Sequence, residues 1–290
     1  MSSIQDAFTY VKGKVADLTD WSHKQTGITL AAMMVAIWDA ETVCLSDIAA
    51  RMPLTGKEES LVQRMRRWLK NPQIDADALY EPIASDILKR LQQTHIRLQL
   101  DRVQLDDRHN VLMASVYWRK RAIPIAWKML PTMGNSNLYQ RRELLKHVAT
   151  LMPARADVRV LADREFGDGG MLRVIEHELG WDYVIRIKSD QLIGDPKEGF
   201  PLQWDTLGDL VPEVGQRPRF LSRVKFTQGE MYTANFVLSQ TDPSTGQATD
   251  APWIVATNLP PTARILHEYG KRFGCEALFS DLKSRGFDWD

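Results

Sequence analysis

The sequence has 290 residues, of which 44% are hydrophobic and 26% are charged. This composition is typical of a globular protein with one large domain or two, and it excludes disordered, collagen-like and coiled-coil chains. The 37 basic and 37 acidic residues balance, which excludes a uniformly basic nucleic-acid-binding protein but allows a locally basic groove. The 2 cysteines exclude a disulfide framework and a four-cysteine zinc site.

The sequence carries no signal for a membrane or for export. Its longest apolar run, residues 28–38, is too short to cross a bilayer. The N-terminus lacks the basic start and the apolar core of a signal peptide. We therefore expect a soluble, cytoplasmic protein without a membrane partner.

Residues 1–95 have the pattern of a helical domain. The expected helices cover residues 28–38, 46–52 and 57–69. Ser46 is the expected N-cap of the second helix. The third helix is basic on one face, which includes Arg64 and Arg67, and the last two helices together resemble a helix-turn-helix. DNA contact by these arginines and a solvated basic face both explain the pattern.

From residue 96 onward the pattern changes to strands and helices in the order β-β-β-α-β-α-β. The expected strands cover residues 96–103, 111–118, 122–130, 158–162 and 183–188, and the expected helices cover residues 137–151 and 171–179. In the first of these helices we expect Leu138 to face the core and Arg141 to face solvent. Short alternating stretches with frequent Pro and Gly then predict a β-rich insertion at about 189–260.

Two aspartates lie on or directly after the expected strands. Asp101 belongs to the first strand, and Asp163 directly follows the buried strand 158–162. If these strands are neighbours, both acids project from the middle of one sheet, where a charge is costly unless it is paired or binds a hard cation such as magnesium. A local Asx turn or helix cap is the alternative for Asp163. Asp106 and Asp107 compete with Asp101 but lie in a hairpin turn.

The last expected helix, residues 262–285, carries a polar stripe. Tyr269, Arg272, Glu276 and Lys283 follow one another at intervals of 3, 4 and 7 residues, and we call them the YREK residues. This spacing places them within about 60° of one helical face. A carboxylate with two cations and a phenol suits a site that holds a metal and a phosphodiester backbone. A solvated face with an Arg–Glu pair explains the same spacing.

The YREK residues carry a resemblance to a known family. The pattern Y-x2-R-x3-E-x6-K is the signature of DDE transposases of the insertion sequence 4 type, and the YREK residues fit it without a gap. Residues 158–167 resemble the second-acid motif of that family, an apolar strand followed by Asp-Arg, and residues 183–188 resemble the strand that follows. The resemblance covers residues from about 90 to 290.

The resemblance implies an α/β fold with an RNase H-like catalytic core, in which helices surround a mixed five-stranded sheet. Residues 1–95 would form an N-terminal helical DNA-binding domain, and residues 96–290 the core with its β-rich insertion. The first two acids would lie on neighbouring strands and the third on a helix.

The resemblance also implies a mechanism, which is two-metal phosphoryl transfer. Asp101, Asp163 and Glu276 would be the catalytic residues and would hold two Mg²⁺ ions, for which Mn²⁺ can substitute. One ion would activate water or a 3′-hydroxyl, and the other would stabilise the leaving oxygen. In similar proteins the Tyr, Arg and Lys of the signature contact DNA. The expected DNA-binding residues are therefore Tyr269, Arg272 and Lys283, with Arg186, Lys188, Arg64 and Arg67 as further contacts.

The function implied is cut-and-paste DNA transposition: strand cleavage and strand transfer at the terminal inverted repeats of the chain's own insertion sequence. The partners would be double-stranded DNA, as transposon ends and target, and a second copy of the chain in a homodimeric complex. Such a protein would be found in the bacterial cytoplasm and, when bound to DNA, at the nucleoid.

One departure from the family affects this interpretation. Similar proteins continue well past the signature Lys, whereas this sequence ends 7 residues after Lys283. We therefore expect a C-terminally shortened chain. The alternative function is that of a catalytically impaired, truncated transposase that binds element ends as an inhibitor. A structure-selective nuclease on the same fold is a third interpretation.

Overall fold

The computed structural model describes residues 3–18, 21, 23–91, 95–105, 107, 109–195, 203–226, 231–283 and 287. The chain forms two compact units, one of Met1–Arg90 with Leu278–Asp290 and one of Leu91–Ala277. Asp106, a competing candidate acid, and Arg285, the expected end of the last helix, lie outside the described residues.

The N-terminal part of the first unit is helical, as expected. Its helices are α1 (Ile4–Leu18), α2 (Lys24–Ala40), α3 (Leu45–Arg51), α4 (Glu58–Leu69) and α5 (Ala76–Leu91). They enclose a core that includes Phe8, Ala32 and Met65. The expected N-cap is wrong, because α3 begins at Leu45, and Cys44 precedes it without a side-chain cap. The hydroxyl of Ser46 instead lies 3.1 Å from the sulfur of Cys44.

By length and composition, no single helix among the described residues is long and apolar enough to cross a membrane. The helices α2 and α3 pass the same test only as a pair, bent by 100° at the break between them.

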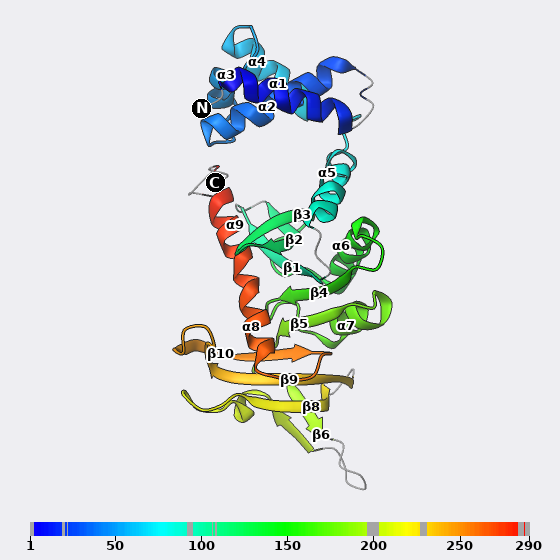
Figure 1. Cartoon of the computed structure of the whole chain (residues 1–290), viewed down its shortest axis with the longest axis vertical. Helices are drawn as coiled ribbons and strands as arrows, with labels where there is room; N and C mark the ends of the chain where they lie inside the picture. Colours follow the sequence, from blue (N-terminus) through cyan, green and yellow to red (C-terminus); the bar gives the residue numbers. More distant parts are fainter. Residues whose placement is uncertain are drawn as a thin grey trace. The chain divides into compact units, whose positions relative to one another are not determined.

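The second unit is built on one mixed sheet of ten described strands (Figure 1). The strands are β1 (His95–Gln104), β2 (Asn110–Trp118), β3 (Arg121–Leu130), β4 (Asp157–Ala162), β5 (Asp182–Arg186), β6 (Leu192–Asp195), β7 (Gln203–Thr206), β8 (Arg219–Phe226), β9 (Tyr232–Thr241) and β10 (Ala248–Thr257). Their order in the sheet is β3-β2-β1-β4-β5-β10-β9-β8-β6-β7. The first five strands in this order begin and end close to the expected bounds, because their alternating and apolar runs are unambiguous.

The β-rich insertion continues the sheet of the preceding strands. β1, β4 and β5 are parallel to one another, and β10 pairs antiparallel with β5. The sheet is therefore wider than the expected five strands, because the insertion extends it from the β5 edge.

Helices cover both faces of this sheet. The helical elements that follow β3 are α6 (Leu138–Leu151), α7 (Gly169–Arg173), the π-turn η1 (Val174–Glu178), the short 3₁₀ turns η2 (Gly208–Leu210) and η3 (Lys271–Phe273), α8 (Arg264–Gly270) and α9 (Gly274–Leu282), of which α9 belongs to the first unit from Leu278 onward. α6 and α7 lie on one face and α8 on the other (Figure 1). Apolar residues of α8 pack on this second face, where they meet β4, β5, β9 and β10.

The orientation expected for α6 is wrong at two positions. Leu138 is 39% exposed, whereas Arg141 is buried. The guanidinium of Arg141 donates to Asp168 at 2.8 Å and to the Ser136 hydroxyl at 2.8 Å. It also lies 4.9 Å from the centre of the Phe166 ring. These partners, of which Phe166 and Asp168 are distant in sequence, offset the cost of burying the charge.

The final helical segment is not one continuous helix as expected. The 3₁₀ turn η3 separates α8 from α9, and glycines, which are poor helix formers, flank it at Gly270 and Gly274. The side chain of Gln99 on β1 donates to the carbonyls of Lys271 and Arg272 at 2.7 and 3.1 Å. A Cβ atom on Gly274 would lie 2.9 Å from the Gln99 amide nitrogen, so a larger residue would displace the side chain that holds η3.

Candidate active site

Two carboxylates meet at the centre of the sheet, at the end of β4. β1 and β4 are parallel, and their pairing register ends at Leu100 opposite Ala162. The next residues along the two strands are Asp101 and Asp163, which therefore lie side by side. Asp163 also accepts a hydrogen bond from the Glu165 N–H at 2.8 Å. Asp163 therefore both forms a local turn and lies beside Asp101 in the sheet, so the two interpretations of this residue are compatible.

Arg272 joins this pair to the final helical segment. One terminal nitrogen lies 3.4 Å from an Asp101 oxygen, and the other lies 3.3 Å from a Glu276 oxygen. Its side chain is only 11% exposed. Its Nε atom is buried and has no hydrogen-bond partner among the described residues. Arg272 therefore neutralises two candidate acids while keeping unused hydrogen-bonding capacity.

The electrostatics of Asp101 reflect an excess of negative charge. Burial is the largest effect on its carboxyl, and together with the nearby carboxylates Asp163 and Glu165 it raises the pKa to about 6. Arg272 and the backbone N–H of Arg102 oppose these effects without overcoming them. A cation placed beside Asp101 would relieve this cost.

The side chains fit a divalent cation by their chemistry. Asp101, Asp163 and Glu276 offer carboxylate oxygens, which are the ligands that Mg²⁺ and Mn²⁺ prefer. In the part of the chain that the structure describes, no three acidic, histidine or cysteine side chains converge closely enough to hold one ion. Arg272 stands between Asp101 and Glu276, so it must move aside before these carboxylates can converge on a metal.

Buried polar side chains that sequence reasoning missed hold this site in place. Gln99 is fully buried and, through the bonds described above, fixes the backbone of η3 next to Asp101. Glu165 accepts hydrogen bonds from Arg102 at 3.0 Å and from the Ser136 N–H at 3.1 Å. Gln99 follows the same polar alternation as Arg97 and Asp101, so the sequence gives no signal that it is buried.

A second charge cluster, also missed, anchors α8 to the sheet. Glu268 pairs with Arg97 at 2.7 Å, with Arg159 at 3.4 Å and with Lys271. Burial alone would raise the pKa of Glu268, but the hydrogen bonds from Arg97 and Lys271 outweigh it and lower the pKa to about 2. This carboxylate is thus held charged by surrounding cations.

The YREK residues do not form the shared surface stripe that was expected. Tyr269 is completely buried, and its ring contacts the Trp253 ring at 5.0 Å between centres. The side chain of Glu276, by contrast, is 58% exposed. Lys283 lies just past the end of α9 and belongs to the other compact unit. The break at η3 changes the helical phase between Tyr269 and Glu276. Contact of Tyr269 or Lys283 with DNA stays a prediction.

The other predicted DNA-binding residues fall into two groups. Arg186 donates to the carbonyls of Ala251 and Pro252 at 3.1 and 3.0 Å, so it fixes β10 where its pairing with β9 shifts register. Arg64 donates to Thr29 and Gln25, and it ties α4 to α2. Lys188 and Arg67 are exposed. Their DNA contacts also stay predictions.

Residues 139–290 match a family model described as "Transposase DDE domain", and this range includes Asp163 and Glu276 but not Asp101. A search of curated proteins gave no match.

A structure described as the cryo-EM structure of the piggyBac transposase synaptic complex with hairpin DNA is similar to this chain, with a TM-score of 0.50 and 11% sequence identity. The similarity covers 96% of this chain and 65% of the piggyBac chain. At 11% sequence identity, this similarity is evidence about the fold alone. Because the family model matches more than half of the residues, we conclude that the chain belongs to the Transposase DDE domain family.

Proposed function

We propose that this chain is a DNA transposase of the insertion sequence 4 type, which cleaves and transfers strands at the terminal inverted repeats of its own element. The observation that carries the proposal is the adjacent pair Asp101 and Asp163, joined through Arg272 to Glu276. These are three acids from two neighbouring strands and a helix. Membership of the Transposase DDE domain family supports phosphoryl transfer, and an RNase H-like core is the fold we propose for it.

Domains of this family generally use divalent metal ions. We assign Asp101, Asp163 and Glu276 as the residues that would hold two Mg²⁺ ions, or Mn²⁺ in their place. When bound, such ions activate the attacking hydroxyl and stabilise the leaving oxygen. The carboxylates would fix their positions.

Arg272 has a part in this site that its contacts suggest. In the free chain its guanidinium compensates the charges of Asp101 and Glu276. The planar fork of Arg272 is suited to a DNA phosphate, which would be its partner in place of these carboxylates in a DNA complex. Tyr269, buried directly beside it, would then position Arg272. The further proposed DNA contacts are Lys283, Arg186, Lys188, Arg64 and Arg67. The proposed assembly is a homodimer, and the proposed location is the bacterial cytoplasm.

The test is a cleavage assay on a labelled duplex that carries the DNA flanking the chain's own gene, in the presence of Mg²⁺. We expect cleavage at a repeat boundary. We expect Asp163→Asn to lower its rate by roughly 10³-fold or more while leaving DNA binding intact. Asp107→Asn is the matched control, because Asp107 is an exposed acid in the turn that follows β1. Equal losses in both variants would contradict the assignment.

The same assay separates the alternative functions. A retarded band without cleavage would favour a chain that binds element ends as an inhibitor. Cleavage of duplexes that lack the repeat would favour a structure-selective nuclease.

A further inference from the structure

The turn between β2 and β3 carries two basic residues in a conformation that they rarely adopt. Trp118 pairs with Arg121 across this hairpin, so Arg119 and Lys120 form a two-residue turn. Their φ angles are 47° and 67°. A two-residue hairpin turn with positive φ at both positions is of type I′, for which asparagine and glycine are strongly preferred. The chain therefore has two long cationic side chains where the backbone favours small residues.

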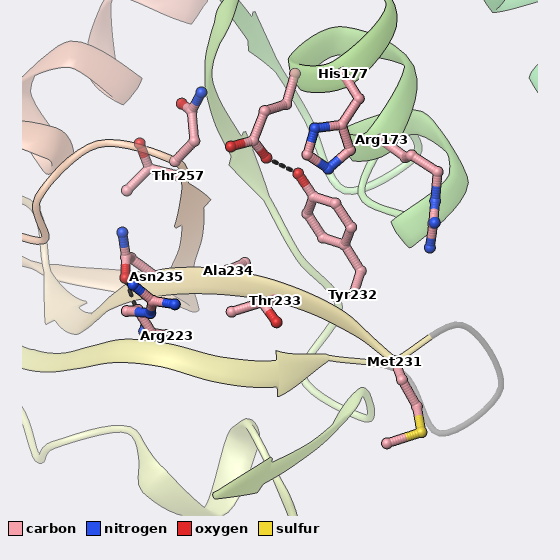
Figure 2. Close-up of a pocket in the computed structure, with 11 residues that line it drawn as sticks. Arg173, His177, Arg223, Met231, Tyr232, Thr233, Ala234, Asn235 and Thr257 are labelled. Atoms are coloured by element: carbon pink, nitrogen blue, oxygen red, sulfur yellow. Dashed lines mark hydrogen bonds between the residues drawn. The ribbon is translucent and has the colours of Figure 1, made fainter. Parts of the chain in front are cut away.

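Another arginine with positive φ has a structural reason for this conformation. Arg223 has φ of 54° and lies in β8 where the pairing with β9 shifts register. Figure 2 shows Asn235 beside Arg223, and the Asn235 side chain accepts the Arg223 N–H at 2.8 Å. The conformation of Arg223 thus belongs to a β-bulge that a side chain holds in place. In the part of the chain that the structure describes, no side chain bonds to the turn at Arg119 and Lys120 in this way.

The positive charges of this turn are not neutralised. Both residues are exposed, and no carboxylate among the described residues pairs with Arg119 or Lys120. The guanidinium of Arg119 lies 5.2 Å from the centre of the Trp118 ring, which supports it without compensating its charge. Because the N–H groups lie in the plane of the guanidinium, they stay available to an anion.

The turn lies next to the final helical segment. A Cβ atom on Gly274 at the start of α9 would lie 3.3 Å from the Tyr117 ring, so the hairpin and this segment are in close contact. Lys120 also lines a cavity of about 330 Å³, together with His267 and Lys271 of the same segment. The turn therefore borders the surface of the segment that carries η3.

The other charged groups of this cavity have partners of their own. Lys271 pairs with Glu268. The acidic residue that lines the cavity is Asp242, and its carboxylate accepts hydrogen bonds from the backbone N–H and the hydroxyl of Ser244 at 2.7 Å each. Asp242 thus stabilises its own turn and forms no ion pair with Lys120 among the described residues.

We propose that the Arg119–Lys120 turn binds the phosphate backbone of duplex DNA. The planar fork of arginine matches a phosphate, and lysine supplies a point charge. Exposed cations without partners gain affinity for DNA by releasing its condensed counterions. The major groove, about 12 Å wide, admits a two-stranded hairpin, so the shape of the turn also suits a duplex.

A binding role also explains the unfavourable turn residues, because strained residues persist where they serve a function. The proposal rests on the proposed function, since it takes DNA as the partner of the chain. It adds a contact outside the candidate carboxylates and the YREK residues.

Two variants separate the charge of the turn from its shape. Arg119→Asn with Lys120→Gly introduces the preferred residues of a type I′ turn, so its unfolding temperature should equal or exceed that of the wild-type chain. Arg119→Gln with Lys120→Gln removes the same charges without relieving the backbone, so its unfolding temperature should stay close to the wild-type value. The control is Arg217→Gln with Arg219→Gln, which removes two exposed arginines at the start of β8, a strand that several others separate from β2.

Binding is measured in EDTA, so that cleavage plays no part, on two labelled duplexes: the DNA that flanks the chain's own gene and an unrelated sequence. If each cation neutralises one phosphate, both turn variants should lose about 1.8 from the slope of log K against log salt and should bind roughly 50-fold more weakly at about 0.1 M salt. The loss should be equal on the two duplexes, because phosphate contacts carry no sequence information. The control should keep the wild-type affinity and slope.

Wild-type binding by either turn variant, or equal losses in the control, would overturn the proposal. A loss on one duplex alone would overturn the backbone as the group that is bound. Failure of the proposed function has a different signature: a chain that binds both duplexes through this turn but cleaves neither in Mg²⁺ would refute transposase activity and leave the DNA contact established.

Discussion

Two charge clusters on the same helical segment have opposite compositions. At Glu268 one carboxylate is surrounded by three cations, Arg97, Arg159 and Lys271. At Arg272 one cation is shared by two carboxylates, Asp101 and Glu276. The pKa of Glu268 is lowered to about 2 by the hydrogen bonds of Arg97 and Lys271, which outweigh its burial. The pKa of Asp101 is raised to about 6, chiefly by burial.

This contrast distinguishes a structural anchor, the Glu268 cluster, from a candidate functional site, the Arg272 cluster. The Glu268 cluster needs no further charge, so it can serve to hold α8 against β1 and β4. The Arg272 cluster has more negative than positive charge when Asp163 is counted with it, and it leaves a buried guanidinium nitrogen without a partner. Ionisable groups with shifted pKa values and incompletely compensated charge are typical of functional sites. Four experiments test this distinction.

The largest stability effect is expected at the anchor. Glu268→Gln removes the carboxylate shared by Arg97, Lys271 and Arg159, although Arg159 keeps a second partner in Asp182. It should lower the free energy of unfolding by about 3 kcal/mol. Glu276→Gln is the same substitution on the same helical segment, at a side chain that is 58% exposed. It should change that free energy by less than about 0.5 kcal/mol. Urea unfolding of both variants measures the difference, and equal effects would remove the distinction.

Acid should weaken the anchor in a defined range of pH. Because the pKa of Glu268 is lower in the folded chain than its ordinary value of 4.5, its stabilising contribution is fully present above pH 4.5. It is lost as the pH falls through about 2, and the expected loss is about 2 kcal/mol. The measurement is the difference in unfolding free energy between the wild-type chain and Glu268→Gln across this range. A difference that does not change with pH would contradict the assigned cause.

Removing Arg272, the cation shared by Asp101 and Glu276, should strengthen metal binding at the candidate site. Arg272→Met takes away the charge that now neutralises Asp101 and Glu276, so the free chain should bind Mn²⁺ about tenfold more tightly. Calorimetric titration with Mn²⁺ in the absence of DNA measures this affinity. Lys271→Met is the control, because Lys271 pairs with Glu268 instead. Unchanged or weaker Mn²⁺ binding by Arg272→Met would show that Arg272 does not compete with a metal.

Much of the fold and part of the site could be predicted from the sequence, because they depend on local patterns. Alternating and apolar runs identified β1 to β5, whereas the position of Asp163 beside Asp101 depended on the pairing of β1 with β4. The misjudged features depend on partners far away in the chain. Arg141 was expected at the surface because its partner Asp168 is not visible in the periodicity of α6. The break at η3 depends on Gln99, which lies on a different element.

The smallest expected effect repeats the contrast within the first unit, on two arginines of α4. Arg64 donates to Thr29 and Gln25, so Arg64→Gln should lower the free energy of unfolding by about 1 kcal/mol. Arg67 is exposed, so Arg67→Gln should leave stability within about 0.5 kcal/mol. If α4 binds DNA, the loss of one phosphate contact at Arg67 should reduce the salt slope of duplex binding by about 0.9. A reduced salt slope for Arg64→Gln with unchanged stability would show instead that a paired arginine can be the DNA contact. Pairing in the free chain would then not distinguish a structural anchor from a binding site.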